Sequence, residues 1–279
     1  MTVVVREPPA ALAGFVQSMT YEAGHQTEAS RERILPGAAM SLWVNLNVDE
    51  FRFCSPDDHR TMRRLPGAIL EGPRDRASVV EIEGGRSQLS VTFTLGLAPP
   101  IFRLPPQVVR NEWVSLEDLW GRDGASVRER LLEAGTPDEK LRILELLLLA
   151  QLPHAPQPDP AILFGVGALE RGVPVTVVAN ELGLLLRTFR RRFIDQVGVR
   201  PKRFARVRRL QQVARTIEGV PAVDWSAVAA DHGYCDQAHL LDDFKDLVGL
   251  TPTAYLRHRT APNHVRLSRP ESDRSAQQP

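Results

Sequence analysis

The sequence predicts an α+β chain: a β-rich N-terminal barrel or sandwich-like domain with trailing helices, followed by an all-α double helix-turn-helix domain. Three observations predict this class. Short runs of β-branched and aromatic residues dominate the first ~95 residues. Four prolines within residues 153–160 mark a boundary. Beyond that boundary the pattern is helical, and one short helical unit occurs twice.

The N-terminal domain, residues 1–152, begins with strands. Ala39–Val48 and Ser87–Leu95 alternate partly between apolar and polar residues, which is typical of strands with one buried face. The clusters Leu65–Gly67 and Glu71–Asp75 combine glycine and proline and predict turns. Many short strands in one compact unit favour a small barrel or sandwich.

Helices complete this domain. Pro137–Leu152 predicts a helix, because its first turn carries acids that suit the helix dipole and it has few helix breakers. Its leucines cover more than one face. This pattern leaves two interpretations open, a helix buried within the domain or a contact between subunits.

The boundaries of the second domain follow from composition. Residues 153–160 cannot continue a helix and predict a linker. The helical domain then extends over residues 161–259. Residues 260–279 hold too few apolar side chains to build a core, so we expect a disordered tail.

The helical domain contains an internal repeat. Thr176–Phe193 aligns with Trp225–Phe244, and Gly183 aligns with Gly233. Each copy reads as a short helix, a tight turn and a second helix, and glycine suits the turn because it accepts positive φ. Between the copies, Arg200–Gly219 predicts a connecting helix of about 20 residues, roughly 30 Å long.

Charge is distributed unequally over the two copies. Residues 187–215 hold 11 basic residues and one acid, whereas residues 216–260 hold three basic residues and seven acids. The basic block indicates a local site for a polyanion, although a solvated arginine-rich helix surface has the same composition.

The residues "VGVRPKRFARVRRLQQVA" and "HGYCDQAHLLDDFKDLVGLTPTAYL" make residues 175–257 resemble the DNA-binding domain of AraC/XylS-type transcription regulators. The resemblance implies a sequence-specific regulator whose partner is double-stranded DNA. "ERILPG", "LWVNL", "EGP" and "VSLEDLWG" match more loosely a subgroup with a β-rich regulatory domain. That match implies ligand sensing or dimerisation without naming a ligand. A small-molecule effector, a homodimer and RNA polymerase are open as further partners.

The resemblance also implies which side chains face DNA. They lie around the first buried residue of each reading helix, Phe189 in the first copy and Leu240 in the second. Arginine can bind guanine or clamp phosphates. In the first copy these candidates are Arg187, Thr188, Arg190 and Arg191; in the second they are Gln237, Ala238, His239, Leu241 and Asp242; Lys202 and Arg206 of the connecting helix suit phosphates.

Two positions depart from the family pattern. Leu185 replaces a frequent serine at the start of the first reading helix and removes an N-cap, or provides an apolar contact. Asp242 stands where arginine is common. It accepts from cytosine, is repelled by phosphate, or pairs internally with an arginine.

We therefore expect the first copy to supply most of the DNA affinity. The second copy then adds weak contacts or meets a protein. The alternative function is a protein-interaction regulator that has lost much of its DNA reading.

Other functions find little support in the residues. The histidines up to the linker form no H-x-H pair, so no metal is expected, and no cofactor fingerprint or catalytic motif argues for an enzyme. Cys54 has no cationic run before it and is expected to be structural. The apolar runs are too short for a membrane segment or a signal peptide, and two isolated cysteines favour a reducing cytoplasm.

Overall fold

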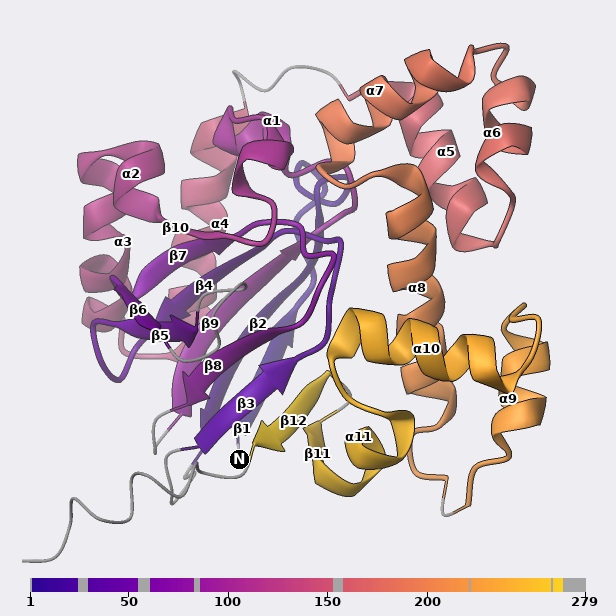
Figure 1. The fold of residues 1–279 in the computed structure, drawn as a ribbon. Helices are drawn as coiled ribbons and strands as arrows, with labels where there is room; N and C mark the ends of the chain where they lie inside the picture. The colour runs from indigo at the N-terminus through magenta and orange to yellow at the C-terminus, as the bar shows by residue number, and fades with distance from the viewer. Residues whose placement is uncertain are drawn as a thin grey trace, which may run out of the picture.

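A computed structural model describes residues 2–24, 30–54, 61–82, 86–152, 158–220, 222–261 and 263–267. It shows a β-rich domain beside a helical domain, with the long helix α8 (Pro201–Thr216) standing between two helical hairpins (Figure 1). The α+β class and the order of the two parts are as the sequence predicts.

The β-rich part consists of two antiparallel sheets of six strands each. In sheet order, the first contains β1 (Thr2–Arg6), β2 (Val16–Gly24), β9 (Arg86–Phe93), β4 (Ser41–Asn45), β7 (Ala68–Glu71) and β10 (Trp113–Ser115). The second contains β11 (Arg259–Ala261), β12 (His264–Leu267), β3 (Ser30–Ile34), β8 (Ser78–Ile82), β5 (Phe51–Cys54) and β6 (Met62–Leu65).

Short helices follow the strands of the first domain. They are α1 (Pro99–Phe102), the 3-10 helix η1 (Pro106–Val109), α2 (Leu116–Trp120), α3 (Arg122–Glu133) and α4 (Pro137–Gln151). The main apolar core lies between the first sheet and these helices. Leu141, Leu144 and Leu148 of α4 are fully buried there, which supports the interpretation of α4 as a helix within the domain. Leu146 on its other face is exposed.

The helical part contains α5 (Pro160–Glu170), α6 (Val175–Glu181), α7 (Leu186–Val197), α8, α9 (Trp225–Asp231), α10 (Gln237–Val248) and α11 (Pro252–His258). Gly183 and Gly233 lie in the two turns with φ of 63° and 68°, as the repeat predicts. α8 has 16 residues. It is therefore about 24 Å long, shorter than expected, because the chain leaves the helix at Ile217.

The predicted disordered tail is wrong for its first residues. The chain reverses after α11 and forms β11 and β12, and β12 pairs with β3 of the N-terminal part. His264 Nδ1 lies 2.8 Å from Glu32 Oε2, and Val265 is buried. Composition missed this strand because it needs no core of its own: it adds to the edge of an existing sheet. Residues 268–279 lie outside the described residues.

The expected linker, residues 153–160, overlaps the start of a helix at its last residue. Residues 153–157 lie outside the described residues, and α5 already begins at Pro160, with the Asp159 side chain accepting from Ala161 N. The two parts also share their cores. Leu35 and Ala38, from the segment between β3 and β4, pack into the apolar clusters of the second and first helical hairpins. The domain boundaries themselves stay a prediction.

Candidate nucleic-acid interface and sheet cavity

The first helical hairpin, formed by α6 and the reading helix α7, presents a cationic face. Phe189 and Phe193 of α7 are fully buried and fix the helix against α5, α6 and α8. Arg187, Arg190 and Arg191 therefore project outward and are exposed, and Thr188 between them is half-buried. None of these three arginines forms an ion pair with a described residue, so their positive charge is available to a ligand.

The start of α7 has no side-chain cap. Leu185 occupies the N-cap position, no side chain there accepts from the backbone, and its side chain is 76% exposed. The sequence argument about the missing cap is thus confirmed. An exposed leucine at this place also leaves the apolar-contact interpretation open.

The second hairpin, formed by α9 and the reading helix α10, has the same helix-turn-helix arrangement but different charged residues. Leu240 and Phe244 are buried, and Asp236 caps α10 by accepting from His239 N at 2.7 Å. The expected reading residues lie around that cap. Gln237, Ala238, His239 and Asp242 are exposed, and Leu241 is half-buried.

Ion pairs with α8 account for two of the acids of α10. Arg206 Nε donates to Asp243 (2.5 Å), its Nη2 donates to Asp246 (2.7 Å), and Arg203 Nη1 donates to Asp246 (2.6 Å). The Tyr234 hydroxyl donates to Asp243, which is 4% exposed. Burial and the Asp243 carboxylate raise the pKa of Tyr234, so it stays a neutral donor. These acids hold α10 to the connecting helix.

The remaining predicted residues also differ in whether they form ion pairs within the protein. Asp242 is exposed and forms no ion pair with a described residue, so internal pairing involves its neighbour Asp243 instead. Lys202 is exposed. Arg206 is occupied by two carboxylates, which argues against the phosphate contact expected for it.

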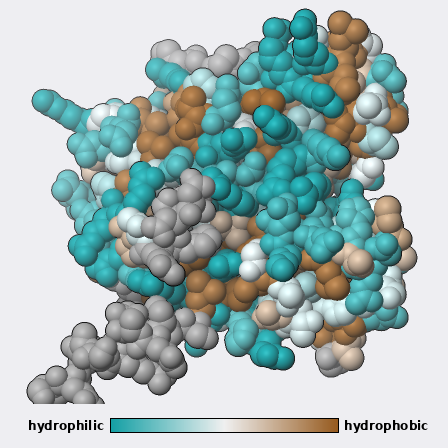
Figure 2. Space-filling model, viewed as in Figure 1, coloured by the Kyte–Doolittle hydropathy of each residue, from teal (hydrophilic) through white to brown (hydrophobic). Residues whose placement is uncertain are grey.

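The two reading helices, α7 and α10, run in a similar direction relative to the β-rich part. In Figure 1, α6 and α9 lie at the outer edge, and α7 and α10 lead back from them towards the β-rich part. The carbonyl of Val248 at the end of α10 accepts from Arg33 Nη1 at 2.7 Å, and that of Leu247 accepts from Ala77 N. Hydrophilic side chains gather over α7 and α8 on this face (Figure 2). The starts of both reading helices therefore lie on the side away from the β-rich part.

A cavity of about 570 Å³ lies between the two sheets and is partly closed by α8. Its lining combines aromatic and apolar side chains with polar and charged ones. The aromatic residues of the lining are Trp43, Phe51, Phe53 and Trp113. Arg208, Gln211 and Arg215 come from α8, Glu218 follows it, and Asn263 and His264 come from the turn before β12 and from its first residue.

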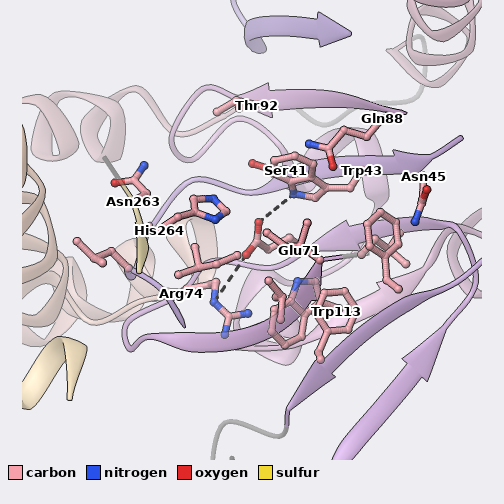
Figure 3. A pocket seen from close by; sticks show the side chains of 18 of the residues that line it. Ser41, Trp43, Asn45, Glu71, Arg74, Gln88, Thr92, Trp113, Asn263 and His264 are labelled. Carbon is pink, nitrogen blue, oxygen red and sulfur yellow. Dashed lines mark hydrogen bonds and ion pairs between the residues drawn. The ribbon is translucent and has the colours of Figure 1, made fainter. Parts of the chain in front are cut away.

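An acid and a base lie together at this cavity. Glu71 Oε2 accepts from the Trp43 indole N–H at 3.0 Å, and its Oε1 lies 3.7 Å from Arg74 Nε (Figure 3). The Arg74 guanidinium lies over the Trp113 ring, 3.9 Å from its centroid. Sequence reasoning missed this site. It recognised Glu71–Asp75 only as a turn, and the turn's acidic and basic residues were the one available signal.

The described residues contain no cluster of three or more His, Cys, Asp or Glu side chains suited to a metal. They also contain no helix long and apolar enough to cross a membrane.

Comparisons with known proteins agree with the geometry of the helical part. Residues 178–258 match the family model described as a helix-turn-helix domain. No curated protein matches the chain.

Solved structures resemble the chain only distantly. An apo form of ToxT from Vibrio cholerae strain SCE256 is 10% identical, with a TM-score of 0.49 over 90% of this chain and 99% of that one. Wild-type ToxT of that strain with a bound unsaturated fatty acid is 10% identical, with a TM-score of 0.47 over 86% and 95%. The AraC-like transcriptional activator CuxR is 15% identical, with a TM-score of 0.26 over 75% and 86%.

The matched residues span both helical hairpins and α8, and their outward arginines suit a polyanion. Residues 178–258 are an AraC-type helix-turn-helix domain, a fold that binds DNA in transcription regulators.

Proposed function

We propose that the chain regulates transcription in response to a small molecule that binds between its two sheets. The observation that carries this proposal is the shared wall of the cavity, to which the β-strands and α8 both contribute. A molecule in the cavity contacts the sensing part and the connecting helix at once. Its binding energy can therefore favour one placement of α8 over another.

The contacts between the parts give this coupling a route. Gln211 of α8 donates to the Pro36 carbonyl, and Leu35 and Ala38 pack against the two hairpins. The strand β12 joins α11 to the N-terminal sheet. A shift of the strands around the cavity is thus transmitted to both DNA-binding hairpins.

We propose further that α7 supplies most of the DNA affinity. Its three outward arginines form no ion pair with a described residue, whereas the expected reading positions of α10 are neutral or acidic. Cationic side chains dominate affinity for DNA because they release condensed counterions. The uncharged and acidic positions of α10 add weaker contacts.

Two experiments test these proposals. Footprinting of the full chain on its own upstream DNA should protect a defined site. A cavity-filling change, Thr92→Trp, should alter operator affinity by about fivefold or more if the cavity is coupled to DNA binding. Arg130→Ala, at an exposed position on α3, is the control and should bind as wild type. Unchanged operator binding by a folded Thr92→Trp protein would count against the effector site.

A second function, contact with a partner protein, is favoured by one observation. Asp242 lies at the outward face of α10 and forms no ion pair within the described part of the chain, and phosphate would repel it there. RNA polymerase or a second copy of the chain are the partners that fit a transcription regulator. Loss of promoter activation by Asp242→Ala with unchanged operator binding would support this function.

A further inference from the structure

The turn after β7, residues 72–77, connects the cavity with the whole DNA-binding part. Its contacts reach three helices. Pro73 packs against Gly198 at the end of α7, where a Cβ atom would lie 2.6 Å from Pro73 Cγ. The Asp75 carbonyl accepts from Arg203 of α8 at 3.0 Å, and Ala77 N donates to Leu247 of α10 at 3.0 Å. This segment, the relay turn, therefore touches both reading helices and the helix between them.

The relay turn is also held firmly on the other side. Arg74 N donates to the Gly37 carbonyl, and Asp75 N and the Asp75 carboxylate bind the Asn111 side chain. At Gly72, a Cβ atom would lie 1.8 Å from the Val109 carbonyl oxygen. A movement of the Arg74 side chain is consequently passed on by a turn with little freedom to absorb it.

Arg74 is the one group of this turn that lines the cavity. It is 2% exposed, and none of its three guanidinium nitrogens has a hydrogen-bond partner among the described residues. Desolvation by burial lowers its pKa to about 10, despite the nearby Glu71 and Glu112 carboxylates, so it remains charged near neutral pH. A buried cation without acceptors is costly, and an added anion relieves that cost.

Glu71 lies close to Arg74 but accepts no hydrogen bond from its guanidinium group. The Trp43 indole holds one carboxylate oxygen, and the other stops 3.7 Å from Arg74 Nε. The guanidinium nitrogens are covered, so an incoming anion has to displace the Glu71 carboxylate or the Trp113 ring. This rearrangement around Arg74 is the movement that the relay turn can pass on to the helices.

We propose that Arg74 anchors the carboxylate of an organic acid in the sheet cavity, and that the relay turn carries its occupancy to α7, α8 and α10. This proposal rests on the proposed function, in which the cavity holds an effector. The aromatic wall favours an acid with an apolar or aromatic body, since such surfaces bury flat apolar groups well. Glu71 competes with the ligand carboxylate for Arg74.

The binding test compares acids with their uncharged amides on the full chain. The probes are 3-phenylpropionate, indole-3-propionate and octanoate, each beside its amide, with thermal stabilisation and calorimetry as readouts. We expect at least one acid to bind roughly tenfold or more tightly than its amide. If no acid of the panel is preferred over its amide, the assignment of Arg74 is overturned.

Two variants give opposite expectations. Arg74→Met should abolish the preference for the acid. Glu71→Gln should strengthen acid binding, because it removes the competing charge. If Arg74 serves only as a structural partner of Glu71, Glu71→Gln lowers stability and leaves acid binding unimproved, which contradicts the proposal even if Arg74→Met does not fold.

The relay is tested by operator affinity of wild type with and without the preferred acid. We expect the acid to change operator affinity by about fivefold or more, and the change to vanish in Arg203→Ala, which loses the contact with Asp75. Acid binding without any effect on the operator overturns the relay and keeps the anion site. Failure of wild type to protect upstream DNA at all contradicts the proposed function instead, so the two failures are distinguishable.

Discussion

The two helical hairpins share a backbone and differ in how they use charge. Arg187, Arg190 and Arg191 of α7 point outward and form no ion pair with a described residue, and the start of α7 is uncapped. α10 is capped by Asp236, and its Asp243 and Asp246 form ion pairs with α8. The difference teaches that apolar and glycine positions build the motif, while the charged positions are used differently: as exposed cations in the first copy and as ion pairs with α8 in the second.

The largest expected effect lies in the second hairpin. Asp243→Ala should destabilise the chain by about 3 kcal/mol, because it removes one of the two carboxylates that pair with Arg206 and leaves the buried Tyr234 hydroxyl without its acceptor. Urea unfolding followed by circular dichroism measures this change. Asp242→Ala, at the exposed neighbour, is the matched control and should stay within about 0.5 kcal/mol of wild type. Equal effects of the two would break the comparison.

In the first hairpin, the expected effect is on DNA. Arg190→Ala or Arg191→Ala should weaken operator binding by roughly 1–3 kcal/mol each if the contact is to a base. If the contact is to phosphate, the loss should be similar on random DNA, and the salt slope should fall by about one unit. Titrations at several salt concentrations distinguish these cases. Binding as tight as wild type in both variants would show that α7 is not the main source of affinity.

Changes at the N-caps of α7 and α10 should have opposite effects on stability. Leu185→Ser gives α7 a side chain able to accept from the backbone and should stabilise the chain by about 1 kcal/mol, whereas Asp236→Ala should cost α10 about the same. Thermal unfolding measures both. A destabilising Leu185→Ser would indicate that this leucine makes a needed apolar contact.

The smallest expected effect concerns the outward acid of α10. Asp242→Arg should tighten binding to all DNA and steepen the salt dependence by about one unit, because it replaces a repulsive charge with a cation near the phosphates. Folding should change little, since the residue is exposed. Weaker operator binding with unchanged binding to random DNA would mean that the carboxylate reads a base.

The repeat itself determined the helical hairpins. Buried Phe189 and Leu240, and the glycines at positive φ, follow from local spacing, so the outward direction of the neighbouring side chains was predictable as well. The order of a β-rich part and a helical part was equally readable. These features depend on residues close together in the chain.

Only the tertiary structure decided the partners of charged groups. Arg206 suits phosphate by its sequence context, but folding brings Asp243 and Asp246 to it. The composition of the tail predicts disorder, yet β12 pairs with β3, more than 200 residues earlier in the chain. The contact between His264 and Glu32 joins residues that are 232 positions apart. The cavity and Arg74 likewise arise where two sheets and α8 meet. Local sequence specifies conformation and face, whereas which opposite charge or open strand edge lies beside a residue is set by the packing of distant segments.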